Sequence, residues 1–295
     1  MGVLLVAPHG KRITLKTIIK YCLVPAMIFL LVACAGGSKS EKKDKIDKID
    51  KNVTVEEHFQ LARYAAEKGN LDEAVRQYEK VLELDPKNAR AHLNLGIVYG
   101  RQNNLIAEPP KDIVDLAGYH LEQLPKKSLW KKEISEYNEA LRIDPNFAEA
   151  HFNLGVAYQE KGKLKEAIAE YEKALQIYPK YLEAHNNLGI LYFRRGMLDQ
   201  ALAEYQKTIE IKPDYAKGYY NIGSVYREKN KIDEAITSFQ KALEINPSFG
   251  EAHYCLAVMY YEKQEFKLAV EHSDQAWKLG IPVDPKFLDR LKPYR

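Results

Sequence analysis

The sequence predicts an all-α solenoid, a stack of helix–turn–helix units, and three observations carry that prediction. Several kinds of residue recur at intervals of 34 positions. Within each interval, apolar residues follow the spacing of three and four that marks one face of a helix. Glycine and proline stand where each helix has to end. A pattern that stays in phase over more than 130 positions indicates a repeat protein.

The 34-residue period is carried by an asparagine–apolar–glycine motif, a tyrosine, an alanine and a proline. The members are Asn153-Leu154-Gly155, Asn187-Leu188-Gly189 and Asn221-Ile222-Gly223; Tyr158, Tyr192, Tyr226 and Tyr260; Ala167, Ala201, Ala235 and Ala269; and Pro145, Pro179, Pro213 and Pro247. In residues 148–181, one apolar stripe contains Leu154 and Tyr158, and a second runs from Leu164 to Leu175. Gly162 separates the stripes, so each unit is expected to be two antiparallel helices.

This pattern resembles the tetratricopeptide repeat, whose small residues correspond here to Gly155, Ala167 and Ala174. The resemblance covers about three quarters of the chain and implies a right-handed α-solenoid of about six repeats. Within a solenoid at 54–283 we place repeats at 55–88, 89–147, 148–181, 182–215, 216–249 and 250–283. Residues 284–295 are expected to form a capping helix that covers the last repeat.

The second repeat is longer than the others. It has 59 residues, and the additional ones are placed as an insertion near 106–129. Pro109 and Pro110 favour a helix start, and apolar residues from Ile113 to Leu124 share one face, so we expect an extra amphipathic helix there. A second phasing stays open, in which 114–147 is a degenerate repeat with His120 in place of a leucine.

The first 33 residues have the features of a bacterial signal peptide. A basic stretch at 11–20 precedes eleven apolar residues at 23–33, which rise only about 16 Å as a helix. The motif Leu31-Val32-Ala33-Cys34 is similar to a lipobox, which implies cleavage before Cys34 and lipid attachment to its thiol. Residues 34–53 then read as a flexible charged tether. The alternative is an uncleaved signal anchor with an incidental cysteine.

The lipobox reading places the protein in the bacterial cell envelope, facing the periplasm. Ala35 follows the lipidated cysteine and departs from the enteric inner-membrane retention signal. An outer membrane is therefore favoured over the inner one if the organism has both.

Charge and cysteine content argue against several classes of protein. The net charge of +3 depends on residues 1–33, and the remainder has 40 basic and 41 acidic side chains. A nearly neutral chain lacks the basic stripe that nucleic-acid binding needs. With Cys22 in the signal peptide and Cys34 lipidated, Cys255 is left alone, so no disulfide framework is available. We expect Cys255 to be a buried, inert thiol.

No catalytic residue, metal site, cofactor or small-molecule substrate is predicted. The common nucleophile, zinc-protease and dinucleotide motifs do not occur. One histidine recurs at the same place in five repeats, at His58, His92, His151, His185 and His253. A single histidine per repeat does not have metal-ligand spacing, so these residues are expected to pack the two helices together.

The resemblance also implies a binding surface, because in this family the first helix of each repeat lines a concave groove. Asparagines at one place per repeat can both donate to and accept from a peptide backbone. A comparable asparagine ladder holds extended peptides in the repeats of O-linked N-acetylglucosamine transferases. The predicted groove residues are Asn94, Asn153, Asn187 and Asn221, the aromatic residues Phe152, Phe193, Tyr220, Tyr254 and Tyr261, and Arg194 and Arg227. Alternatively, the asparagines have no binding role and some of the rings fill seams between helices.

These features predict a non-enzymatic, membrane-anchored adaptor that binds protein or peptide partners during assembly of a cell-envelope complex. A carboxylate-binding groove is disfavoured, because acidic residues alternate with the basic ones. The alternatives are an adaptor for peptidoglycan-modifying enzymes, an enzyme with a site that the sequence does not reveal, or a cytosolic co-chaperone-like adaptor with an unused signal.

Overall fold

The computed structural model describes residues 53–107 and 129–295, and in these residues it contains thirteen α-helices and no strand. The helices are α3 (Val55–Glu67), α4 (Leu71–Leu84), α5 (Ala89–Ala107), α6 (Trp130–Ile143), α7 (Ala148–Glu160), α8 (Leu164–Ile177), α9 (Leu182–Arg194), α10 (Leu198–Ile211), α11 (Ala216–Glu228), α12 (Ile232–Ile245), α13 (Gly250–Glu262), α14 (Phe266–Lys278) and α15 (Pro285–Leu291), followed by the 3₁₀ helix η2 (Lys292–Tyr294).

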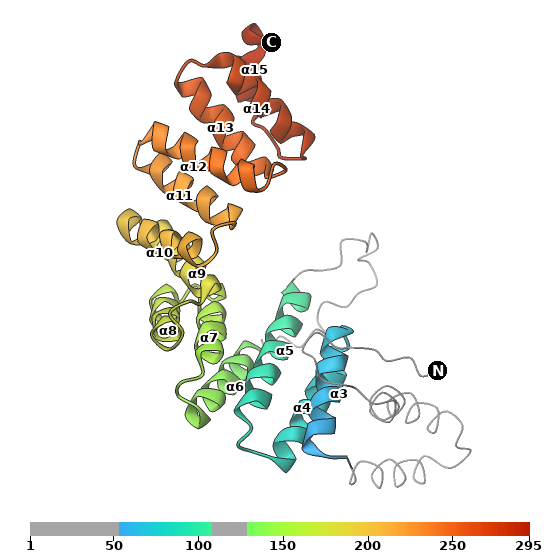
Figure 1. The fold of residues 1–295 in the computed structure, drawn as a ribbon. Helices are drawn as coiled ribbons and strands as arrows, with labels where there is room; N and C mark the ends of the chain where they lie inside the picture. Colours follow the sequence, from blue (N-terminus) through green and yellow to red (C-terminus); the bar gives the residue numbers. More distant parts are fainter. Residues whose placement is uncertain (1–52, 108–128) are drawn as a thin grey trace, which may run out of the picture. The chain divides into compact units, whose positions relative to one another are not determined.

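The chain divides into two compact units, and the division falls inside α6, between Glu136 and Tyr137. Within the first unit, α3 packs on α4 and α4 packs on α5. Within the second, α7 pairs with α8, α9 with α10, α11 with α12, and α13 with α14. The second helix of each pair packs on the first helix of the next (Figure 1). Contacts between sequential neighbours define a solenoid, so the prediction of an all-α solenoid is confirmed.

The turns inside the repeats depend on one residue in the left-handed backbone region. Gly162 has a φ of 71° and follows Lys161, the C-cap residue of α7, so it ends that helix as predicted, and Gly69 and Gly196 hold the equivalent places. Asn230 and Gln264 adopt the same conformation in the last two repeats, with φ of 58° and 62°. The left-handed residue ends the first helix and reverses the chain into the second.

Small residues allow the two helices of a repeat to approach closely. A Cβ atom added at Gly155 would lie 2.7 Å from the Tyr171 ring, and one at Gly189 would lie 2.6 Å from the Tyr205 ring. On the opposing helices, Ala167 and Ala201 are completely buried. Each aromatic ring therefore occupies the space that a larger residue at the glycine position would need.

The last helix closes the second unit. Asp284 caps α15 by accepting a hydrogen bond from the Lys286 N–H at 3.0 Å, and Pro285 begins the helix. Phe287 and Leu291 are buried in the same apolar cluster as Leu256 and Met259 of α13. The tail thus covers apolar surface on the last repeat, which is the role expected of a cap.

Three predictions concern residues that lie wholly or almost wholly outside the described ranges. These are the signal peptide at 1–33, Cys34 with the tether at 34–53, and the helix in the insertion at 106–129. Within the described ranges, no helix combines the length and apolar character needed to cross a bilayer.

Candidate functional site

Two of the predicted asparagines belong to a continuous row of hydrogen bonds that crosses three repeats. Asn221 Nδ2 on α11 donates to Asn186 Oδ1 on α9 at 3.0 Å. Asn186 Nδ2 donates to Asn187 Oδ1, and Asn187 Nδ2 donates to the Tyr171 hydroxyl, both at 3.3 Å. That hydroxyl donates to Gln159 Oε1 on α7 at 3.1 Å. We call these five residues the asparagine row.

The other two predicted asparagines lie outside this row. Asn153 Nδ2 donates to the Glu149 carbonyl of its own helix at 2.8 Å. Asn94, on α5 of the first unit, is half-buried, and its amide has no hydrogen bond to any of the described residues. All four asparagines lie on first helices, but the four are not brought into one common network.

Several of the predicted aromatic residues pack against rings of their own solenoid. Phe152 lies 4.8 Å from Tyr181 and 5.7 Å from Tyr171, measured between ring centroids. Tyr220 contacts Phe249 and Phe239 in the same way, at 4.9 and 5.6 Å. Tyr254 and Tyr261 contact Phe287 of α15, and Phe193 packs on the central apolar cluster. Each ring is partly exposed, and the rest of its surface packs in the contact between helices.

The predicted arginines are exposed, and one lies beside the last repeat's cysteine. Arg227 Nη1 is 3.6 Å from Cys255 Sγ, across the junction between the fifth and sixth repeats. Cys255 is buried as predicted, and its burial raises the pKa of the thiol, although the nearby Arg227 charge opposes that rise. The sequence alone did not suggest a cation near Cys255, because Arg227 belongs to the preceding repeat.

The recurring histidines join helices and repeats at the same time. In each case Nδ1 bonds to a residue on the second helix of the same repeat, at 2.6–2.8 Å: His58 to Gln77, His92 to Glu136, His151 to Glu170, His185 to Glu204 and His253 to His272. In four of them Nε2 donates to the proline carbonyl that closes the preceding repeat, at Pro86, Pro145, Pro179 and Pro247. The predicted packing role is confirmed.

Two acceptors on one imidazole favour its protonated form, since only that form has two N–H donors. Burial lowers the pKa of His185, but hydrogen bonds to Glu204 and to the Pro179 carbonyl, with the Glu204 charge, outweigh burial and raise it overall. Burial raises the pKa of Glu170, but hydrogen bonds from His151 and Lys173 lower it overall. The last repeat differs, because burial and the neighbouring His253 lower the pKa of His272.

We expect the His185–Glu204 contact to stabilise the fold most in mildly acidic solution. The folded-state pKa of His185 lies above 6.5, its ordinary value. Its stabilisation is therefore fully present below pH 6.5 and disappears as the pH rises through the folded-state pKa. Melting temperatures of the wild type and His185→Gln should differ more at pH 6 than at pH 9. A difference that does not change with pH would show that folding leaves the pKa of His185 at its ordinary value.

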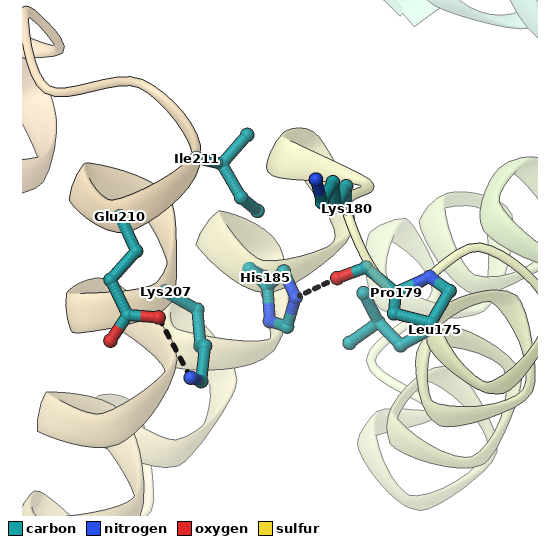
Figure 2. Close-up of a pocket in the computed structure, with 7 residues that line it drawn as sticks. All are labelled: Leu175, Pro179, Lys180, His185, Lys207, Glu210 and Ile211. Carbon is teal, nitrogen blue, oxygen red and sulfur yellow. Dashed lines mark hydrogen bonds and ion pairs between the residues drawn. The ribbon is translucent and has the colours of Figure 1, made fainter.

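A surface cleft lies at the junction of the third and fourth repeats (Figure 2). It has a volume of about 530 Å³ and is lined by Leu175, Pro179, Lys180, His185, Lys207, Glu210 and Ile211. Lys207 pairs with Glu210 at 2.8 Å, and His185 bonds to the Pro179 carbonyl at 3.0 Å. Because its polar groups are largely engaged with one another, the cleft gives no basis for assigning a small-molecule ligand. Among residues 53–107 and 129–295, no group of three or more His, Cys, Asp or Glu side chains could hold a metal ion.

Three members of the asparagine row were not predicted from the sequence: Asn186, Tyr171 and Gln159. Tyr171 looked like a core residue, and its ring is indeed buried. Asn186 stands at a position that is aromatic in four other repeats, at Phe59, Phe152, Tyr220 and Tyr254. The asparagine at this mostly aromatic position was the sequence signal that could have identified Asn186 as a member of the row.

Three family models match the sequence. One described as "TPR repeat" matches residues 65–103 and 223–264, and two described as "Tetratricopeptide repeat" match residues 146–214 and 204–237. Together these matches cover more than half of the chain. The comparison with curated proteins found no match.

Solved structures with the same fold include a crystal structure of MamA, which is 30% identical over 63% of this chain and 95% of its own, with a TM-score of 0.51. YrrB, described as a TPR protein with an unusual peptide-binding site, is 21% identical over 73% of this chain and 97% of its own, with a TM-score of 0.55. PilF of Pseudomonas aeruginosa is 22% identical over 70% of this chain and 83% of its own, with a TM-score of 0.56.

Proposed function

We infer, because this chain belongs to the tetratricopeptide repeat family, that it is an adaptor whose repeats bind a partner polypeptide. Tetratricopeptide repeat proteins generally bind protein or peptide partners and do not catalyse reactions. We further propose that Cys34 carries a lipid that tethers the adaptor to the bacterial envelope membrane, on the periplasmic side, and that the adaptor serves the assembly of an envelope complex.

The asparagine row is the observation that carries the binding proposal. Asn187 and Asn221 each use one amide proton within the row, which leaves each Nδ2 a second proton. Asn221 Oδ1 has no partner among the described residues. These groups are held in fixed orientations by their neighbours, so less conformational freedom is lost when a peptide backbone binds to them.

Two further observations support this proposal. YrrB shares the fold and is described as having a peptide-binding site. By analogy, we expect the repeats of this chain to bind a peptide as well. Tyr220, next to Asn221 in the sequence, is partly exposed, as are Tyr254 and Tyr261 on α13, and aromatic residues are common at the centres of protein interfaces. The lipid anchor rests on the lipobox-like motif that ends at Cys34.

Replacing Asn187 and Asn221 of the asparagine row should weaken partner binding. Partners would first be captured by crosslinking in intact envelopes and identified by mass spectrometry. We expect Asn187→Ala with Asn221→Ala to reduce the affinity for the captured partner by about tenfold, since two hydrogen bonds to the partner are lost. Affinity is measured by calorimetry and helicity by circular dichroism.

Tyr171→Phe is the matched control. It removes the hydroxyl at the centre of the row, but the Tyr171 ring is completely buried, so the change removes no group that a partner can touch. The proposal requires the asparagine variant to bind much more weakly than Tyr171→Phe at equal helicity. Equal binding by both would leave the asparagines with a scaffold role alone.

The identity of the captured proteins separates envelope assembly from the alternative of peptidoglycan metabolism, which predicts hydrolases or synthases. Metabolic labelling with palmitate tests the anchor, and we expect label on the wild type and none on Cys34→Ala. An unlabelled wild type would favour a cytosolic adaptor.

A further inference from the structure

The loop between the third and fourth repeats carries an exposed aromatic residue where three other repeats carry a residue that accepts a stabilising hydrogen bond. Tyr178 ends α8 and is 52% exposed. At the equivalent place, Asp85, Asp144 and Asn246 each accept a hydrogen bond from the backbone N–H two residues later, at 3.0–3.3 Å. Such turns hold the loop in shape. A tyrosine ring cannot accept that bond, so Tyr178 forgoes a local stabilisation that these three counterparts have. Lys212, at the same place in the fourth repeat, forgoes it as well.

Tyr178 is the exposed end of a line of rings that leads into the core. Its ring centroid lies 5.7 Å from that of Tyr181. Tyr181 lies 4.8 Å from Phe152, and Phe152 lies 5.7 Å from the buried Tyr171. The inner rings are fixed by packing, so Tyr181 is a rigid support for Tyr178 at the surface.

Two carboxylates lie near these rings, one on each neighbouring first helix. Glu149 on α7 and Glu183 on α9 are both exposed. Glu183 stands two residues after Tyr181, and Glu149 stands one helical turn before Phe152, whose ring contacts that of Tyr181. In keeping with that placement, burial and the negative charges of Glu149 and Glu183 raise the pKa of the Tyr181 hydroxyl. Neither has an ion-pair partner in the described part of the chain. Acidic residues in the first turn also stabilise their helices, and that role does not account for the exposed Tyr178.

We propose that Tyr178 and Tyr181, with Glu149 and Glu183, bind a cationic side chain, arginine or lysine, of the partner polypeptide. The rings offer their π faces to the cation, and the carboxylates supply opposite charge. This proposal rests on the adaptor function, and it adds that the bound segment carries a basic residue near the junction of the third and fourth repeats.

The test uses the full chain and two synthetic peptides of equal length. One is a fluorescein-labelled Gly-Ser peptide with two arginines, and the other has citrulline, a neutral isostere, at both positions. We expect the arginine peptide to bind the wild type on the order of 3- to 30-fold more tightly than Tyr178→Asn at low salt, by fluorescence anisotropy. Glu149→Gln with Glu183→Gln should weaken binding of the arginine peptide as well, and added salt should reduce the difference.

Tyr178→Asn is chosen because asparagine occupies this place naturally at Asn246, so the loop can form the same turn and the melting temperature should not fall. Tyr64→Ala is the matched control, since Tyr64 on α3 is similarly exposed, at 56%, but lies in the first unit. It should bind the arginine peptide as the wild type does.

Three results would overturn the cation site: no binding of the arginine peptide to the wild type, equal binding of the citrulline peptide, or unchanged affinity in Tyr178→Asn. None of them contradicts the adaptor function, which the captured partner and the asparagine variants test separately. In a further outcome, the asparagine variants bind the natural partner normally while Tyr178→Asn loses the arginine peptide. That result would support the cation site and contradict a binding role for the asparagine row.

Discussion

Replacing Leu291 by alanine is expected to destabilise the second unit by about 2–5 kcal/mol. The Leu291 side chain is completely buried at the end of the chain's last apolar cluster. Its truncation leaves a cavity against α13 and α14 that the surrounding side chains fill only in part. For a chain of this size the melting temperature should fall by roughly 5–15 °C, measured by calorimetry or circular dichroism.

Deleting residues 284–295 should have a larger effect, because Phe287 is lost together with Leu291. The deletion also exposes apolar side chains of the last repeat, so the truncated chain should self-associate. Light scattering after gel filtration measures that association. Lys286→Ala, an exposed change on the same helix, should leave the melting temperature within about 2 °C of the wild type. A monomeric truncated chain with the wild-type melting temperature would show that α15 is not a cap.

Gly189→Ala is expected to destabilise the fold by about 1–3 kcal/mol, although alanine is the better helix former by about 1 kcal/mol. The added Cβ would lie 2.6 Å from Cε1 of Tyr205. The Tyr205 ring is itself buried between repeats, so it cannot move aside without disturbing its neighbours. The loss of stability is measured by chemical denaturation.

A double-mutant cycle isolates this contact. Tyr205→Leu removes the crowding ring and leaves space beside Gly189. In that background, alanine at position 189 should cost much less or become stabilising. If Gly189→Ala raises the stability of the otherwise unchanged chain, helix propensity decides the outcome and the ring contact does not.

Much of the fold could be predicted because the repeat geometry demands particular residues at particular places. Gly155 and Gly189 are needed where an aromatic ring of the second helix packs directly against the first helix. Gly162 is needed where the backbone adopts the left-handed conformation. These demands return in each repeat, so the sequence shows them several times over. Asn230 and Gln264 take the same left-handed conformation without glycine, so that turn was less visible in the last two repeats.

The candidate site could be predicted less completely, because its important contacts join different repeats. The period reveals that Asn187 and Asn221 are equivalent, but not that Asn221 bonds to Asn186, 35 positions earlier. Nor does it reveal that Arg227 reaches Cys255. Such contacts depend on how one repeat rotates against the next, and a residue pattern within one repeat contains no information on that rotation.

The asparagine row also has a direction. Every amide donor in it points from α11 toward α7, so its two ends are chemically unlike. The Asn221 end offers an unpaired carbonyl oxygen beside its second N–H, while the Gln159 end, whose oxygen accepts from Tyr171, offers an NH₂ group. A peptide backbone alternates donors and acceptors in an order that reverses with its chain direction. If a partner backbone binds to the row as proposed, we therefore expect its two orientations to bind unequally, with one N-to-C direction favoured.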